Sequence, residues 1–231
     1  PFNDTDFEYD ALNKISWIKG SDYKIRLSAA SSGYQSVLPL SLITRFLSDL
    51  VLDNANKEDL SIKEKKQIEK EVNKVMNDKS LTDGVKFAML RNISSRFKYS
   101  CFVNIVEEME LNLCPESQRS VLFDLLSYAN KIELNRLVLT THSPYVINYL
   151  TLAAKAFLLT QKISANETLQ ERIKEVVPAD SAIDPARLRI YELKDGGVFR
   201  LSTYEGLPSD ENFLNIQLGV TNELFDQLLE I

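Results

Sequence analysis

The chain has 231 residues, of which 44% are hydrophobic and 26% charged, a composition typical of a globular protein with a sizeable core. Its formal net charge of −6 and isoelectric point of about 5.0 argue against a chain-wide basic surface for nucleic acid. Two cysteines are too few for a disulfide framework or a zinc site, and no apolar run predicts a membrane span, so we expect a cytoplasmic protein with reduced thiols.

The first half of the sequence predicts one strand and several helices. Residues 23–27 alternate apolar and polar side chains, which indicates a short strand that leads into a Ser-Ser-Gly turn. Apolar residues then recur at helical spacing over residues 35–50. We expect residues 48–97 to form a helical insertion beside the main sheet, with a strongly charged first helix and a second helix over residues 83–97.

The second half predicts strands that alternate with helices. Residues 101–106 form an almost continuous apolar run, which is typical of a strand covered on both faces, and residues 137–140 predict the next strand. A helix separates the two, and residues 156–159 predict a further strand. Residues 187–192 and 198–203, joined across a Gly-Gly turn, predict a β-hairpin before a last helix. The predicted fold class is therefore α/β, with a mainly parallel sheet, flanking helices, a helical insertion and a C-terminal β-hairpin.

Two carboxylates end the first of these apolar strands, at Glu107 and Glu108. Hydrolysis of a phosphoanhydride requires Mg²⁺ to neutralise the phosphates and a carboxylate to orient or deprotonate the attacking water. Adjacent side chains point apart, so one acid can face the water shell of the metal while the other faces the γ-phosphate. Taken alone, the pair is better explained by acids that merely begin a solvated loop.

The next strand ends in the only histidine of the chain, His142. A single histidine cannot form a histidine-based metal cluster. Thr141 and Ser143-Pro144 surround it with hydrogen-bonding and turn-forming groups, and its place in the sequence leaves room for one helix and one strand after Glu107. The simpler alternative is a core histidine whose ring nitrogens are hydrogen-bonded within the protein.

A third segment, Ser31-Ser32-Gly33-Tyr34-Gln35, lies upstream at the predicted start of a helix. Backbone N–H groups and the helix dipole favour an anion at such a position. Gly33 lacks the side chain that would block close approach of a ligand. Taken alone, the segment is also compatible with an ordinary serine N-cap.

In this order, the three segments resemble the C-terminal part of an ABC-class ATPase of the OLD, RecF and SMC-like group. Relatives often show two acids, Pro, Glu, then Leu-x-Leu-His-Pro and a Gln three residues on. The chain reads Glu107-Glu108-Met109-Glu110-Leu111-Asn112-Leu113-Cys114-Pro115-Glu116-Ser117-Gln118, and it departs from the pattern at Met109 and at Cys114. The string from Thr140 to Pro144 resembles the switch-histidine segment, and Ser32-Gly33-Tyr34-Gln35 resembles the signature motif, Ser-Gly-x-Gln.

The resemblance implies a role for each segment. Glu107 would stand on the metal side of a Walker B motif, Glu108 would be the general base, and His142 would contact the γ-phosphate. The signature segment, Ser31, Ser32, Gly33 and Gln35, would bind the γ-phosphate of ATP held by another subunit. ATP and Mg²⁺ are the implied cofactors, and a head-to-tail, ATP-dependent homodimer is the implied assembly.

No glycine in the sequence is followed by lysine, so the chain has no Walker A loop. With its start at Pro1, we therefore expect residues 1–231 to be the C-terminal lobe of an ATPase whose N-terminal nucleotide-binding lobe lies elsewhere, and to be inactive alone. Relatives act in DNA maintenance and phage defence, so the resemblance also allows a nucleic-acid or nuclease partner.

Two rival functions remain open from the sequence. A metal-dependent nuclease-associated domain could use Glu107, Glu108 and Glu110, although the Toprim pattern requires an Asp-x-Asp strand after the Glu strand. The only Asp-x-Asp in the sequence, Asp4-Thr5-Asp6, lies in a polar terminus and precedes the Glu-bearing strand. The other rival is an ATP-independent protein-interaction module that docks through the charged residues 57–74.

Overall fold

A computed structural model of the chain describes residues 5–56, 62–96, 100–163 and 166–231, which adopt a mixed α/β fold with small sheets. The parallel pair in this part of the chain is β4 (Val103–Glu107) with β5 (Arg136–Thr140). The other sheets in the described residues are antiparallel, so the expected mainly parallel sheet is not what the structure shows.

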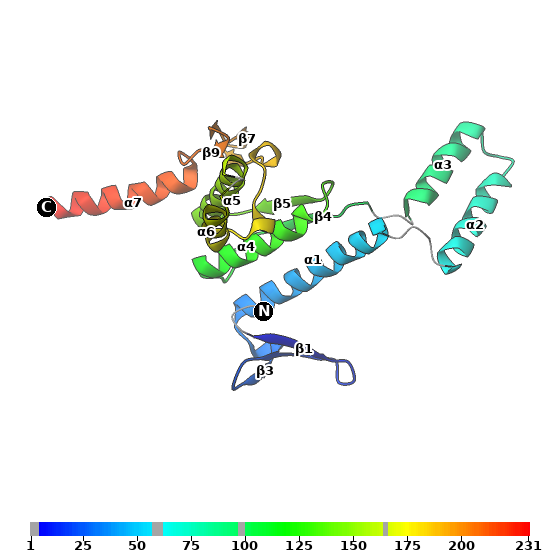
Figure 1. Cartoon of the computed structure of the whole chain (residues 1–231), viewed down its shortest axis with the longest axis horizontal. Helices are drawn as coiled ribbons and strands as arrows, with labels where there is room; N and C mark the ends of the chain where they lie inside the picture. The colour runs from blue at the N-terminus through cyan, green and yellow to red at the C-terminus, as the bar shows by residue number, and fades with distance from the viewer. Residues whose placement is uncertain (1–4, 57–61, 97–99, 164–165) are drawn as a thin grey trace.

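The main body is built on the unit β4–α4–β5–α5. Helix α4 (Pro115–Asn130) connects the two parallel strands, and α5 (Pro144–Lys162) follows β5 (Figure 1). Both helices begin with proline at a position where a missing N–H costs little. Their apolar faces form the core with one face of the strands, through Val106, Val121, Leu122, Leu125, Leu126, Val146, Leu150, Ala153 and Ala154.

The other face of β4 and β5 is open to solvent. Val103, Ile105 and Val138 are 57%, 68% and 48% exposed on this outer face, while the alternate residue Val106 is buried. The expectation that β4 is covered on both faces is therefore wrong for the described residues, because the body packs helices on the inner face alone. Parallel sheets in globular proteins are normally covered on both faces.

Residues 156–159 do not form the predicted strand. This apolar run belongs to the long helix α5 and not to a strand, so the described residues contain one strand–helix–strand unit where we expected more. A short apolar run cannot be assigned to a helix or a strand by periodicity alone.

Helix α1 (Ser32–Asn56) joins the body to two outlying parts of the chain. It packs against α4, and its Thr44 Oγ1 accepts a hydrogen bond of 3.0 Å from Asn104 Nδ2 of β4. By length and composition, Ser32–Asp53 is the one stretch of the described residues apolar enough to cross a membrane. Thr44, which is buried and hydrogen-bonded to Asn104, instead fits a helix that packs on protein.

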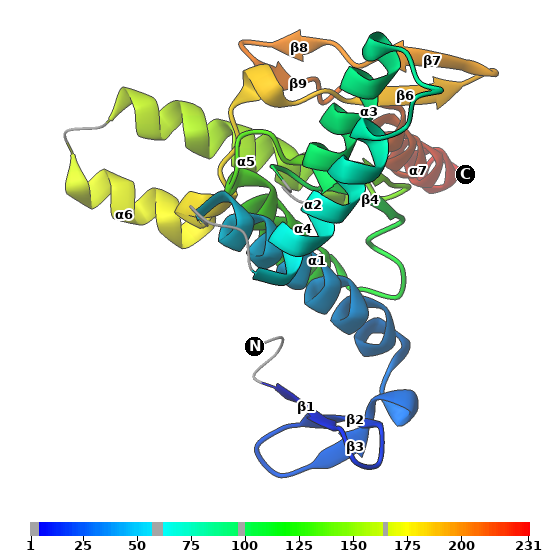
Figure 2. The same ribbon diagram turned by 90° about the vertical axis from the view of Figure 1, so that its right-hand side faces the viewer.

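An antiparallel sheet precedes α1, formed by β1 (Asp6–Asp10), β2 (Ile15–Lys19) and β3 (Lys24–Arg26). Strand β3 corresponds to the strand predicted over residues 23–27. The sheet leads through the short 3-10 helix Leu27–Ala29 into α1, and it lies at the N-terminal end of that helix (Figure 2).

Beyond the other end of α1, helices α2 (Ile62–Met76) and α3 (Asp83–Arg96) pack against each other. The helical content expected over residues 48–97 is present, although residues 48–56 continue α1 and residues 57–61 and 97 lie outside the described part. The pair projects away from β4 and β5 in Figure 1 instead of lying beside that sheet, because the unbroken α1 carries it outward.

The C-terminal part contains the predicted hairpin. Strands β6 (Tyr191–Lys194) and β7 (Gly197–Arg200) pair antiparallel across Asp195-Gly196, two residues with positive φ angles of 50° and 74° that suit a tight hairpin turn. The hairpin begins later than expected, because Pro185–Arg187 forms a 3-10 turn.

Other short elements complete this region: helix α6 (Glu167–Val176), the 3-10 turn Ala179–Ser181, and the pair β8 (Thr203–Tyr204) and β9 (Leu207–Pro208). Helix α7 (Phe213–Leu229), which contains the predicted last helix, extends away from the body (Figure 1) and has no buried residue.

Candidate functional site

The candidate site lies at the carboxyl ends of β4 and β5. In the register of this parallel pair, Glu107 lies opposite Thr140, so the residues that follow each strand meet at the same edge of the sheet. Glu107, Glu108 and His142 are therefore close together in the fold, as the two apolar runs predicted.

Glu108 turns sharply out of the strand. Its φ angle of 46° is in the left-handed region that non-glycine residues rarely adopt. The backbone N–H of Glu108 donates to Thr140 O at 3.0 Å and lies 3.2 Å from Thr140 Oγ1, which holds the residue against β5. Strained backbone of this kind is concentrated at functional sites.

This turn brings the Glu108 carboxylate to the histidine. Glu108 Oε1 lies 3.6 Å from His142 Nε2, and the two side chains are 48% and 85% exposed. The contact is an ion pair when the imidazole is protonated, and solvent screens it. Because both groups are accessible, the pair can face a ligand that arrives from solution.

Glu107 is the exposed last residue of β4. In the described ranges, no group of three or more His, Cys, Asp or Glu side chains could hold a metal ion by itself. Mg²⁺ is commonly bound through one or two carboxylates together with substrate phosphates and water. The exposed carboxylate of Glu107 fits that mode, in which one protein acid contacts a phosphate-bound cation.

Between β4 and α4, residues 108–113 form a loop that we call the acid loop. Met109, the first departure from the resembled pattern, is 4% exposed and belongs to the hydrophobic core. Leu111 N donates to Glu108 O and Leu113 N donates to Glu110 O, so successive turns shape the loop. The Met109 side chain therefore anchors the acid loop by packing in the hydrophobic core.

Cys114, the second departure, is an exposed thiol at the N-cap of α4. Its Sγ lies 3.2 Å from Ser117 Oγ. The hydrogen bond from the Ser117 side chain, with help from the Ser117 backbone, lowers the pKa of the Cys114 thiol from its ordinary value.

The signature segment contacts the far end of the acid loop. A Cβ atom placed on Gly33 would lie 3.0 Å from Asn112 O and 3.2 Å from Leu113 Cδ2, so glycine permits this close approach of α1 to the loop. Ser31 and Ser32 are exposed, and Gln35 Nε2 donates to Ala30 O at 2.8 Å.

The signature segment and the acid–histidine pair do not meet. In the described part of the chain, no hydrogen bond of Ser31, Ser32 or Gln35 reaches Glu108 or His142. The structure thus brings Gly33 to the acid loop but does not gather the whole signature segment around the pair.

Glu110, a candidate acid of the rival nuclease, and Gln118, which has no predicted role, also link the ends of the strands. Glu110 Oε1 accepts hydrogen bonds from Thr141 Oγ1 and from the backbone N–H of His142. Gln118 Oε1 accepts a hydrogen bond of 2.7 Å from Ser143 Oγ, and Gln118 Nε2 donates to Leu113 O. Both belong to the string that resembles the Walker B region, and this resemblance is the sequence signal that they share.

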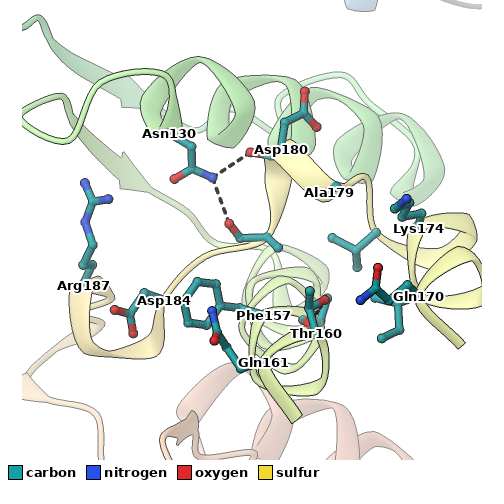
Figure 3. A pocket seen from close by; sticks show the side chains of 14 residues that line it. Asn130, Phe157, Thr160, Gln161, Gln170, Lys174, Ala179, Asp180, Asp184 and Arg187 are labelled. Atoms are coloured by element: carbon teal, nitrogen blue, oxygen red, sulfur yellow. Dashed lines mark hydrogen bonds between the residues drawn. The ribbon is translucent and has the colours of Figure 1, made fainter. Parts of the chain in front are cut away.

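A cavity of about 370 Å³ lies elsewhere, between α5, α6 and the segment that follows α6 (Figure 3). Asn130 Nδ2 crosses toward this segment and donates to Asp180 O and Ala182 O. Lys174 in its wall is already paired with Glu171. None of the predicted site residues lines this cavity.

Comparison of the chain with protein-family models, with curated proteins and with solved structures finds no match.

Proposed function

We propose that the chain is the C-terminal lobe of an ABC-class ATPase of the OLD, RecF and SMC-like group, and that it contributes to ATP binding and hydrolysis. The main support is the 3.6 Å contact between Glu108 and His142 at the carboxyl ends of adjacent parallel strands. An acid and a histidine delivered by neighbouring strands can act on the same phosphate and the same water.

In this proposal, Glu108, His142 and Glu107 have different roles in hydrolysis. The Glu108 carboxylate orients the attacking water and accepts its proton. The His142 imidazole, whose Nε2 faces Glu108, donates a hydrogen bond to the γ-phosphate and keeps Glu108 directed at the water. Glu107 binds the water shell of Mg²⁺, which neutralises the phosphates when bound.

The open outer face of β4 and β5 supports the involvement of a further lobe. Val103, Ile105 and Val138 form an apolar surface on a parallel pair, a type of sheet that is normally covered on both faces. A nucleotide-binding lobe that carries a Walker A loop would cover this surface and supply the main grip on the phosphates.

The position of the signature segment supports a shared site. Ser31 and Ser32 are exposed at the start of α1, and in the described residues no hydrogen bond links them to the acid–histidine pair of their own chain. Backbone N–H groups at such a helix start can bind the phosphate of ATP held by a second subunit. We therefore include an ATP-dependent, head-to-tail homodimer in the proposal.

The test uses this chain joined to its Walker A lobe, with two variants. Glu108→Gln keeps size and hydrogen bonding but removes the base, so ATP should bind and the dimer should accumulate without hydrolysis. Ser32→Trp places a bulky side chain at the exposed start of α1, away from the buried contact of Gly33 with the acid loop, so ATP should bind without dimer formation. Light scattering after size-exclusion chromatography, with and without ATP and Mg²⁺, distinguishes the two; a Glu108→Gln monomer beside a Ser32→Trp dimer would contradict the proposal.

The rival nuclease function is less well supported by the geometry. Glu110, its third acid, uses Oε1 to bind Thr141 and the His142 backbone, and its Oε2 is buried. It is therefore not available beside Glu107 and Glu108 as a metal ligand. Metal-dependent DNA cleavage that is lost in Glu107→Gln would favour the nuclease, and partner binding that is insensitive to ATP would favour the interaction module.

A further inference from the structure

The carboxylate of Glu110 crosses from the acid loop to the turn that follows β5. Its Oε1 accepts hydrogen bonds from Thr141 Oγ1 at 2.9 Å and from the backbone N–H of His142 at 2.6 Å. Its Oε2 is buried and has no hydrogen-bond partner in the described part of the chain. A loop acid that served only solubility would direct both oxygens to water.

Thr141 extends this connection along the turn. Its hydroxyl donates to Glu110 and accepts a hydrogen bond of 2.9 Å from the backbone N–H of Ser143. One carboxylate oxygen thus organises the backbone on both sides of His142.

The imidazole of His142 needs such support from its backbone. The side chain is 85% exposed, so little packing fixes the ring. Its distance from Glu108 therefore depends on where the turn holds its backbone. A charge-assisted hydrogen bond to the His142 N–H is the direct restraint, and bonds of this kind are stronger than those between neutral groups.

We propose that Glu110 is a positioning residue, which holds the Thr141–His142 turn so that the imidazole stays beside Glu108. The two acids of the loop then have different roles. The side chain of Glu108 faces the ligand, whereas the side chain of Glu110 binds the backbone of His142. The value of this arrangement for hydrolysis rests on the proposed function, whereas the restraint itself belongs to this chain alone.

The experiment uses the fact that the chain has one histidine. Labelling with ¹⁵N-histidine gives one backbone amide signal and one imidazole, so both can be followed by NMR without further assignment. Hydrogen exchange of the His142 amide reports the bond to Glu110. The change of the imidazole signals on Glu108→Gln reports whether the ring lies beside Glu108.

We expect Glu110→Ala to speed exchange of the His142 amide by at least about tenfold, as expected for loss of a hydrogen bond to a charged acceptor. Glu110→Gln keeps an acceptor at the same reach and should retain most of the protection. Glu110→Asp keeps the charge but shortens the reach, so it should behave like Glu110→Ala, and it replaces that variant if Glu110→Ala does not fold. Glu107→Ala, at the same sheet edge, should leave the exchange unchanged.

The change of the His142 imidazole signals on Glu108→Gln distinguishes a positioning role of Glu110 from a general effect on stability. In the parent chain this substitution should shift the imidazole signals, and in the Glu110→Asp background the shift should be much smaller. Unchanged exchange and an unchanged response in both Glu110→Ala and Glu110→Asp would overturn the proposal. Failure of ATP-driven dimer formation would overturn the proposed function instead, and it would leave these measurements on the isolated chain unaffected.

Discussion

At the scale of single residues, the left-handed backbone of Glu108 is the clearest sign that the acid loop is shaped for more than stability. A non-glycine residue in this region costs on the order of 1 to 2 kcal/mol. The hydrogen bond from Glu108 N–H to Thr140 O stabilises this conformation and so offsets its unfavourable energy. We interpret the strain as the cost of directing the carboxylate toward His142.

The strain can be measured with two matched glycine variants. Glu108→Gly relieves the left-handed conformation, so the free energy of unfolding should be unchanged or higher by up to about 1 kcal/mol. Glu107→Gly places glycine in an extended strand and should lower that energy by about 0.5 to 1 kcal/mol. Urea denaturation of the chain compares the two, and an equal loss in both would show that Glu108 is not strained.

The Cys114 thiol gives a pH-dependent prediction. Ser117 lowers the pKa of Cys114, so a larger fraction of thiolate is present at neutral pH, and alkylation by iodoacetamide should be faster than in Ser117→Ala, roughly several-fold. The difference should vanish well above the ordinary thiol pKa of 9.0, where both thiols are ionised. Partly buried Cys101 is the internal control; equal Cys114 rates at neutral pH would contradict the prediction.

At the scale of elements, β4 has one covered and one open face. The same substitution on each face measures the difference. Val106→Thr puts a hydroxyl into the core and should cost about 1 to 3 kcal/mol of the free energy of unfolding, whereas Val103→Thr on the open face should change it by less than about 0.5 kcal/mol. Thermal and urea denaturation provide the values. Similar costs at both positions would mean that the outer face is covered in solution, for example by another copy of the chain.

The sequence predicts those parts of the fold whose pattern is local. The strand ends at Glu107 and Thr140 and the hairpin turn at Asp195-Gly196 follow from apolar runs and turn residues. The run at residues 156–159 predicts a strand but lies in α5, because four apolar residues suit a buried helix as well as a strand. The outward direction of α2 and α3 depends on the continuity of α1, which a change in composition does not reveal.

The candidate site also contains features that the sequence predicts and features that it does not. Glu107, Glu108 and His142 could be placed at one edge because parallel strands align their carboxyl ends. The hydrogen bond from His142 N–H to Glu110 and the contact of Gly33 with Asn112 join residues far apart in the sequence. Such contacts depend on tertiary packing and could not be derived from spacing.

At the scale of the whole molecule, the absence of a Walker A loop from the sequence sets the expected activity of the isolated chain. We expect negligible ATP hydrolysis and weak ATP binding, because the principal phosphate-binding loop is missing. Phosphate release measured with ATP and Mg²⁺ tests this expectation, with Glu108→Gln as the control. Robust turnover by the chain that is lost in Glu108→Gln would show that it carries a complete site.

Helix α7 has a consequence for how the molecule behaves at its C-terminal end. Asn212 caps its first turn by accepting a hydrogen bond from Asn215 N–H, and Glu192 accepts one from Phe213 N–H, but no residue of the helix is buried. Beyond the hydrogen bond from Asn215 to Asn148 of α5, little packing supports the outer turns of α7, and an isolated helix of this length is only marginally stable in water. Limited proteolysis should therefore shorten the chain from this end first and leave the β4–β5 body intact, so the outer turns of α7 become stable only when an apolar surface covers them.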